Sequence, residues 1–178
     1  VASNNPLLEA EDTVTNTGTV SAGGTVLVRA QDAVNETLTT TASTSSGTGR
    51  STVSYITAGP TASISGENVF IVAESDDPNR GTVTNTGGAI TNTSADGQTI
   101  IRASGDIVNQ VLVTQGVEAV EVGNFVAEAR EDFTIREDYT AGVIGGEGNV
   151  SVVSTGGDII NDASSIFSNE GDVLIFAE

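Results

Sequence analysis

The sequence predicts an all-β chain that coils into a parallel β-helix (β-solenoid) of about seven turns. β-Branched residues dominate the apolar set, with 22 Val and 13 Ile against six Leu, and they pack better on a pleated sheet than on a helix. Gly, Asn and Ser are abundant and supply tight corners. A short phrase also recurs, mostly every 20 to 30 residues, which suits one turn of a solenoid.

The recurring phrase reads Gly, any residue, apolar, any, apolar, any, Ala. Copies of it, some degenerate, begin near Leu8 and lie at 24–30, 67–73, 97–103, 123–129, 148–154 and 171–177. Because alternate residues of a strand share a face, equivalent positions should stack in inward columns. The predicted columns are Val26, Val69, Thr99, Phe125, Val150 and Val173; then Val28, Ile71, Ile101, Ala127, Val152 and Ile175; then Ala30, Ala73, Ala103, Ala129, Ser154 and Ala177. Ile101 and Ile175 are therefore expected in the core.

A second phrase, Asp, two residues, Asn, follows the first phrase in several copies. It occurs at 32–35, 76–79, 106–109 and 158–161, and Asp12 with Asn16 resembles it with one inserted residue. Asparagines stacked at a corner can pass side-chain amide hydrogen bonds along the axis, although an ordinary turn residue fits the pattern equally well. Parallel stacking would also gather the acids at one corner, and these are Asp32, Asp76, Asp106 and Asp158.

The whole chain, 1–178, is expected to be a single β-helix segment. The interval between Ala30 and Ala73 is the longest, and it holds a stretch rich in Thr and Ser. Two interpretations fit it: a loop or enlarged turn at 39–52, or an additional turn around Val53, Tyr55 and Ile56.

The net charge of the chain limits the classes of function that it can have. The net charge is −18, with six Arg and no Lys, which opposes nucleic-acid binding and attachment to anionic lipid. No apolar run approaches the length of a membrane span, so membrane insertion is not expected. The chain has no Cys or His, which leaves out disulfides, thiol chemistry and the commonest metal ligand.

Asp76, Asp77 and Asn79 form the densest group of oxygen ligands, and such a turn is a candidate Ca²⁺ site. A solvated acidic turn is the preferred interpretation, so no cofactor is expected. Arg136, Phe133 and Tyr139 belong to a small duplicated motif, in which the two aromatic residues would share one strand face. This motif is either a charged, aromatic contact stripe or an ordinary exposed β surface.

Parallel β-helices also host polysaccharide lyases and hydrolases, which use paired carboxylates. Asp76 and Asp77 form such a pair, but the chain lacks Lys and His. We therefore expect no catalytic activity and no catalytic residues.

The two phrases together resemble the haemagglutinin repeats of filamentous haemagglutinins and of the contact-dependent-inhibition proteins of Gram-negative bacteria. The resemblance lies in 21–28, 103–109, 157–163 and the longer unit at 41–73. It implies a right-handed parallel β-helix, export by two-partner secretion, and a rod on the cell surface. The absence of Lys and the excess of acids depart from that family.

The sequence thus favours a non-catalytic structural shaft segment of a secreted, surface-exposed filamentous adhesin or toxin-delivery protein, located on the bacterial cell surface. Its partner would be a component of a host or neighbouring cell surface. Two alternatives remain: a self-assembling extracellular fibre or matrix subunit that stacks end to end, and, less favoured, a β-helix polysaccharide-active enzyme.

Overall fold

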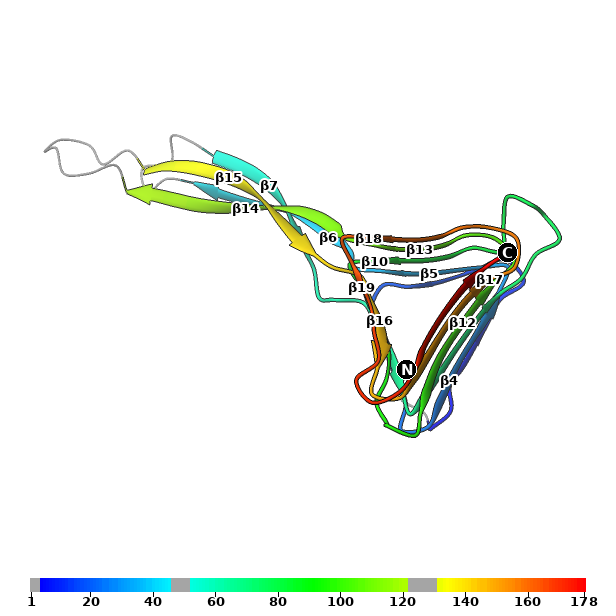
Figure 1. Cartoon of the computed structure of the whole chain (residues 1–178). Helices are drawn as coiled ribbons and strands as arrows, with labels where there is room; N and C mark the ends of the chain where they lie inside the picture. Colours follow the sequence, from blue (N-terminus) through cyan, green and yellow to red (C-terminus); the bar gives the residue numbers. More distant parts are fainter. Residues whose placement is uncertain (1–3, 46–51, 122–130) are drawn as a thin grey trace, which may run out of the picture.

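Three parallel sheets form the sides of a triangular coil. The computed structural model describes residues 4–45, 52–121 and 131–178, and these contain strands but no helix. Viewed along the coil axis, the three sheets enclose a triangular interior, and a pair of hairpins leaves one corner (Figure 1). The all-β, solenoid-like architecture with stacked parallel strands is therefore confirmed. No helix in the described part of the chain is long and apolar enough to cross a membrane.

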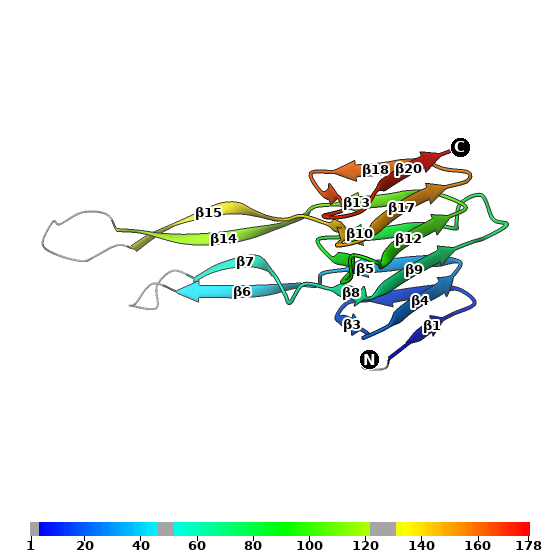
Figure 2. The same ribbon diagram turned by 60° about the horizontal axis from the view of Figure 1, so that its bottom comes forward.

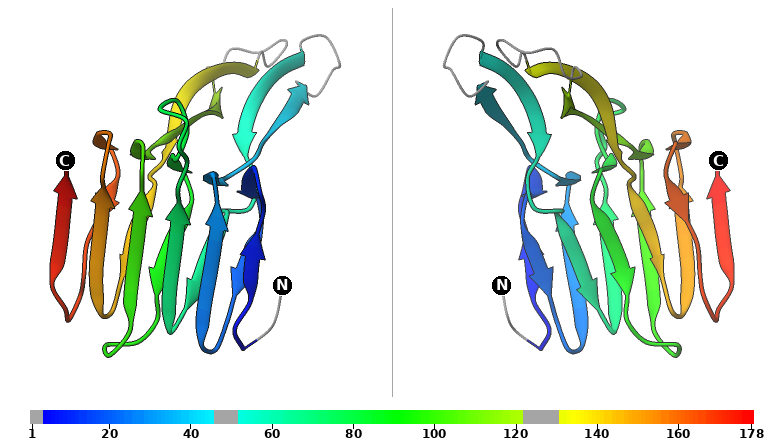
Figure 3. Two further views of the ribbon diagram at one scale, coloured as in Figure 1. Left: turned by 90° about the vertical axis from the view of Figure 1, so that its right-hand side faces the viewer. Right: turned by 90° about the vertical axis from the view of Figure 1, so that its left-hand side faces the viewer.

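The first side, here called the long sheet, has six parallel strands. Figure 3 shows them side by side from the blue N-terminal strand to the red C-terminal one. In spatial order they are β1 (Leu7–Glu9), β4 (Thr25–Ala30), β9 (Asn68–Ala73), β12 (Gln98–Ala103), β17 (Asn149–Ser154) and β20 (Val173–Ala177).

The other two sides have five parallel strands each. The second sheet contains β2 (Thr13–Asn16), β5 (Asp32–Glu36), β10 (Val83–Thr86), β13 (Ile107–Gln110) and β18 (Ile159–Asp162). The third sheet contains β3 (Thr19–Ser21), β8 (Ser63–Gly66), β11 (Ala89–Asn92), β16 (Val143–Gly146) and β19 (Ser165–Ile166). The chain visits the three sides in turn, so each strand pairs with its counterpart one coil away (Figure 2).

The predicted inward columns are present in the long sheet. Val26 pairs with Val69, Val69 with Thr99, Thr99 with Val150, and Val150 with Val173. The neighbouring columns run through Ile101 and Ala103 in the same register. Ile101 is fully buried, whereas Ile175 is 51% exposed. The core assignment of Ile175 is therefore wrong, because β20 has a paired strand on one side only.

The long sheet differs from the sequence-based prediction between β12 and β17. β12 pairs directly with β17 across all six residues of each strand, so no strand stands between them in the long sheet. Phe125, Ala127 and Ala129, which were predicted to fill that place, lie outside the described residues. The long sheet thus has six strands, whereas the seven repeat copies in the sequence predicted seven.

Branched aliphatic side chains from all three sheets fill the interior. The fully buried set includes Ile71 and Ile101 of the long sheet, Val83 and Ile107 of the second, and Ile90 and Ile144 of the third. β-Branched side chains are stiff, so their stacking in register builds a close-packed core at a small entropic cost.

The glycine that opens the repeat phrase is required by the close stacking of the coils. A Cβ atom added at Gly97 would lie 2.0 Å from the carbonyl oxygen of Glu67, and one added at Gly148 would lie 2.0 Å from the carbonyl oxygen of Gly97. No side chain fits at either of these positions unless the backbone moves.

The corner between the second and third sheets has two forms. It is tight between β2 and β3, between β10 and β11, and between β18 and β19. In the intervening coils it is replaced by antiparallel hairpins, β6 (Thr39–Ser45) with β7 (Thr52–Ala58), and β14 (Leu112–Glu121) with β15 (Glu131–Thr140). Val53, Tyr55 and Ile56 belong to β7, so they lie in a hairpin that enlarges the corner and form no additional coil.

Candidate functional site

A ladder of asparagines runs along the coil axis at the end of the second sheet, and all its members are buried except Asn161, which is exposed. Each side-chain amide donates to the side-chain oxygen of the next asparagine, and every link measures 2.7 Å. The members are Asn16, Asn35, Asn85, Asn109 and Asn161. Of the two sequence-based interpretations, the structure therefore shows the ladder.

The same amides also fasten the corner to the third sheet. Asn85 Nδ2 donates to the carbonyl oxygens of Gly88 and Val143, at 3.0 and 3.2 Å. Asn109 Nδ2 likewise donates to the carbonyl oxygen of Ser165 at 3.0 Å. Among the described residues, no buried side-chain nitrogen or oxygen lacks a hydrogen bond. Because these polar groups are all satisfied, the ladder has a structural role and offers no free group to a ligand.

A second buried polar cluster closes the corner between the third sheet and the long sheet. The Thr99 hydroxyl accepts from the backbone and side-chain amides of Asn92, at 2.9 and 3.1 Å, and donates to the carbonyl oxygen of Gly145 at 2.9 Å. Asn92 Oδ1 accepts from the amide of Gly148 at 2.7 Å. Thr99 occupies a column otherwise filled by valines, and this network satisfies its hydroxyl.

The acidic corner differs from the sequence-based alignment. Strand pairing places Thr13 beside Asp32, and the register of β5, β10, β13 and β18 continues that column through Thr82, Asp106 and Asp158. Asp76 is not part of it, because 76–79 belong to the longer connection between β9 and β10. The ladder asparagine of that coil is Asn85, so the phrase at 76–79 was assigned to the wrong position.

An arginine links three successive coils at this corner. Arg80 Nε donates to Asp32 Oδ2 at 2.8 Å, and Arg80 Nη2 pairs with Asp12. Asp32 Oδ1 accepts from the amide and the hydroxyl of Thr82, at 2.9 and 3.0 Å. Burial raises the pKa of Asp32, but the hydrogen bonds from Thr82 and Arg80 outweigh it and lower that pKa below its ordinary value. Hydrogen bonds to Asp32 and Asp12 raise the pKa of Arg80.

The candidate calcium ligands lie together in an exposed turn. Asp77 Oδ1 accepts from the backbone and side-chain amides of Asn79, at 2.9 and 3.2 Å, and the amide of Asp77 donates to Ser75 Oγ at 3.1 Å. Asn79 thus turns its amide nitrogen toward Asp77. Within the described residues, no group of three or more Asp, Glu, His or Cys side chains is placed to hold a metal ion.

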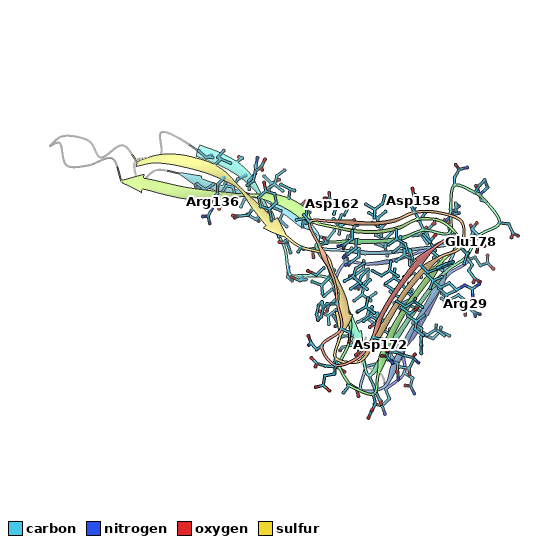
Figure 4. The ribbon with its side chains drawn as sticks, in the orientation of Figure 1. Arg29, Arg136, Asp158, Asp162, Asp172 and Glu178 are labelled. Carbon is cyan, nitrogen blue, oxygen red and sulfur yellow. The ribbon has the colours of Figure 1, made fainter. Side chains whose placement is uncertain are left out.

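The outer surface of the coil is charged. Asp158, Asp162, Asp172 and Glu178 lie on the perimeter of the triangle, outside its apolar interior, and Arg136 lies on the hairpins (Figure 4). A shallow groove open to solvent passes the 74–77 turn and is lined by Glu74, Asp76, Asp77 and Arg102, among others. Arg102 Nε and Glu74 Oε1 are 3.4 Å apart. The paired carboxylates of Asp76 and Asp77 therefore lie in an open surface depression.

The two hairpins lie next to each other and form what we call the arm. The backbone amide of Ile56 in β7 donates to Gln115 Oε1 of β14 at 3.3 Å. The arm projects away from the coil (Figures 1 and 2). Several large apolar residues on it are exposed, namely Leu38, Ile56, Val113, Ile135 and Tyr139.

The predicted contact stripe falls on this arm. Phe133 and Tyr139 are both in β15; Tyr139 is 63% exposed, while the side chain of Phe133 lies outside the described part of the structure. The Tyr139 hydroxyl donates to Glu137, and this bond raises the pKa of Tyr139. Sequence reasoning missed Val113 and Ile135, although the alternation of apolar residues along 111–120 was an available signal for a strand.

Comparison with protein-family models, with curated proteins and with solved structures finds no match for this chain. Its geometry and chemistry are therefore the basis for a functional proposal.

Proposed function

We propose that the chain is a structural shaft segment of a secreted, surface-exposed filamentous adhesin or toxin-delivery protein, and that it is non-catalytic. One observation carries this proposal: a coil of in-register parallel strands bound from end to end by the asparagine ladder. Such a structure extends by repetition along one axis, which suits a protein whose task is to span distance.

Rigidity along the axis supports this role. Each coil is joined to the next by backbone hydrogen bonds in three sheets, by a ladder bond, and by aliphatic columns. A single hydrogen bond contributes a net ~0.5–1.5 kcal/mol, but bending the coil would disturb many of them together. The net charge of −18 favours solubility and opposes side-by-side association of shafts.

We propose a right-handed sense for the coil. Connections between parallel strands of one sheet are right-handed in about 98% of known cases, because a right-twisted strand returns to its sheet favourably only in that sense. All three sheets here are built from such connections. The repeats in the sequence support the same hand through their resemblance to haemagglutinin repeats.

Cell-surface location is the feature to test first. Intact cells that produce the protein would be treated with an external protease and labelled with antibodies raised against this chain. The proposal expects labelled filaments in electron micrographs and loss of the label after protease treatment. A protein that stays protected until the cells are lysed would overturn it.

The partner and the fibre-subunit alternative need separate measurements. The purified chain would be tested for binding to host cells and to neighbouring bacterial cells, and the shaft proposal expects binding to one of these cell surfaces. Sedimentation over a wide range of concentrations would detect end-to-end polymers. Growth of long polymers by the isolated chain would favour the fibre subunit over the shaft.

A further inference from the structure

The outer edge of β15 is a long strand edge without a paired neighbour in the described structure. Along the coil axis, the arm strands follow the order β6, β7, β14, β15 (Figure 2). β14 pairs with β15 over ten residues and lies next to β7 on its other side. β15 pairs with β14 alone among the described strands. An edge of ten residues presents backbone donors and acceptors to any extended chain that approaches it.

One face of this hairpin carries two apolar cross-strand pairs beside the free edge, with the polar pair of Gln115 and Glu137 between them. Two cross-strand pairs, Val113 with Tyr139 and Val117 with Ile135, lie on the same face because their positions differ by even numbers. Val113 is 49% exposed, Ile135 is 48% exposed and Tyr139 is 63% exposed. Aromatic and aliphatic groups at such a position are typical of the centre of a protein interface.

The sequence of the edge strand β15 is rich in acidic residues. The segment that forms β15 contains Glu131, Asp132, Glu137 and Asp138 against a single cation, Arg136. Arg136 Nε lies 3.3 Å from Asp138 Oδ1, so this cation is already paired within the strand. The edge therefore favours a partner that brings positive charge.

We propose that the β15 edge binds a basic, extended segment of a partner protein by strand addition. Main-chain hydrogen bonds to the edge would supply affinity. Residues on one face of the added segment would cover Ile135 and Tyr139 and approach Glu137 between them, and Lys or Arg side chains on its opposite face would lie near Asp138. A second copy of this chain is the less suitable occupant. The net charge is −18, and β6, the strand at the opposite side of the arm, carries Thr, Ser and Ala with no cation.

This inference goes beyond the shaft function and stands or fails independently of it. The test uses the full chain and a synthetic peptide of about ten residues in which Lys alternates with Val, matched to the length of the edge. Two further peptides carry N-methyl groups at alternate residues, in the two opposite phases. In an added strand only alternate amides face the neighbour. One phase should therefore weaken binding by roughly tenfold or more, while the other leaves it nearly unchanged.

Variants then locate the site. Glu137→Gln with Asp138→Asn removes two charges at the edge and should weaken binding of the Lys peptide about fivefold to tenfold. The matched control, Glu170→Gln with Asp172→Asn, removes two exposed charges from the coil and should change the affinity less than about twofold. An acidic peptide of the same length should not bind.

Three results would overturn the proposal. The first is absence of peptide binding. The second is equal weakening by both N-methyl phases or by both double variants, since either would indicate a general attraction between a cation and an acidic rod. The third is dimerisation of the chain without any peptide binding, in which the dimer is lost in Ile135→Arg. That result would show that the arm binds a second copy of the chain.

Discussion

At the scale of single residues, Asn85 is the central member of the asparagine ladder. It accepts from Asn35 and donates to Asn109 while fully buried. Asn85→Ala removes the acceptor of one Asn35 N–H, although Asn35 keeps its bond to the carbonyl oxygen of Ala89, and it leaves Asn109 Oδ1 without its donor. Each such buried group costs about 1–3 kcal/mol. We expect the free energy of unfolding to fall by ~3 kcal/mol in chemical denaturation.

The matched control is Asn79→Ala, because the sequence phrase predicts Asn79 at the ladder position that Asn85 occupies in the structure. Asn79 is exposed, so its replacement should change stability by no more than ~0.5 kcal/mol. Equal effects of the two variants would contradict the ladder assignment.

Protonation of Asp32 should make the fold less stable as the pH falls into the acidic range. Its pKa in the folded chain is below the ordinary value of 3.8. The charged carboxylate therefore stabilises the fold above that pH, and the contribution is lost as pH falls through the folded pKa. The difference in unfolding free energy between the parent and Asp32→Asn should be constant above about pH 5 and should shrink below about pH 4.

An Arg80→Met background tests the cause of this shift. Arg80 is one of the groups whose hydrogen bonds lower the pKa of Asp32. Without Arg80, the Asp32→Asn substitution should lower the free energy of unfolding by a smaller amount at neutral pH. A substitution effect that keeps its full size in this background would show that Thr82 alone holds the carboxylate.

At the scale of elements, the place of a strand in the stack decides what its inward residues contribute. Ile101 lies in β12, between β9 and β17, and is fully buried, whereas Ile175 lies in β20 and is half exposed. Ile101→Asp buries an unpaired charge and should destabilise the fold by several kcal/mol, roughly 4 or more.

Ile175→Asp changes the same column at a position that remains in contact with water, so its effect should stay below ~2 kcal/mol. Thermal melts followed by circular dichroism would compare the two variants with the parent. Similar melting temperatures for both variants would mean that the stack is not bounded at β20 under the conditions of the measurement.

At the scale of the whole molecule, the net charge of −18 repels itself along the coil. Asp106 and Asp158 occupy neighbouring positions in one column, so screening should relieve part of this repulsion. We expect the melting temperature to rise by about 2–8 °C between low salt and about 1 M NaCl. A melting temperature that does not change with salt would show that the acids are too far apart to interact.

Comparing the melting temperature in calcium and in magnesium at equal ionic strength distinguishes general charge screening from binding at a specific site. The turn at Asp76, Asp77 and Asn79 is the candidate, and Asp77 Oδ1 already accepts two bonds from Asn79. The two cations should therefore raise the melting temperature equally. A larger rise with calcium, abolished in Asp77→Asn, would identify that turn as a calcium site.

The sequence by itself determined the strand content and the inward columns. Alternation of Val and Ile with polar residues is a local property, and a small residue such as Ala30 or Ala103 marks the end of every long-sheet strand after β1 in the sequence as in the structure. The period of the repeat then predicts parallel stacking, because identical strands one coil apart bury the same face.

Only the tertiary structure decided which copies of a phrase stack together. Asp76 and Asn79 match the phrase, but the register of β10 gives their places to Thr82 and Asn85. Likewise β12 pairs with β17, and the intervening segment contributes the β14–β15 hairpin of the arm. The physical reason is that a pattern fixes which face of a strand is buried, whereas the choice of its neighbour depends on the connections that bring the two strands together in space.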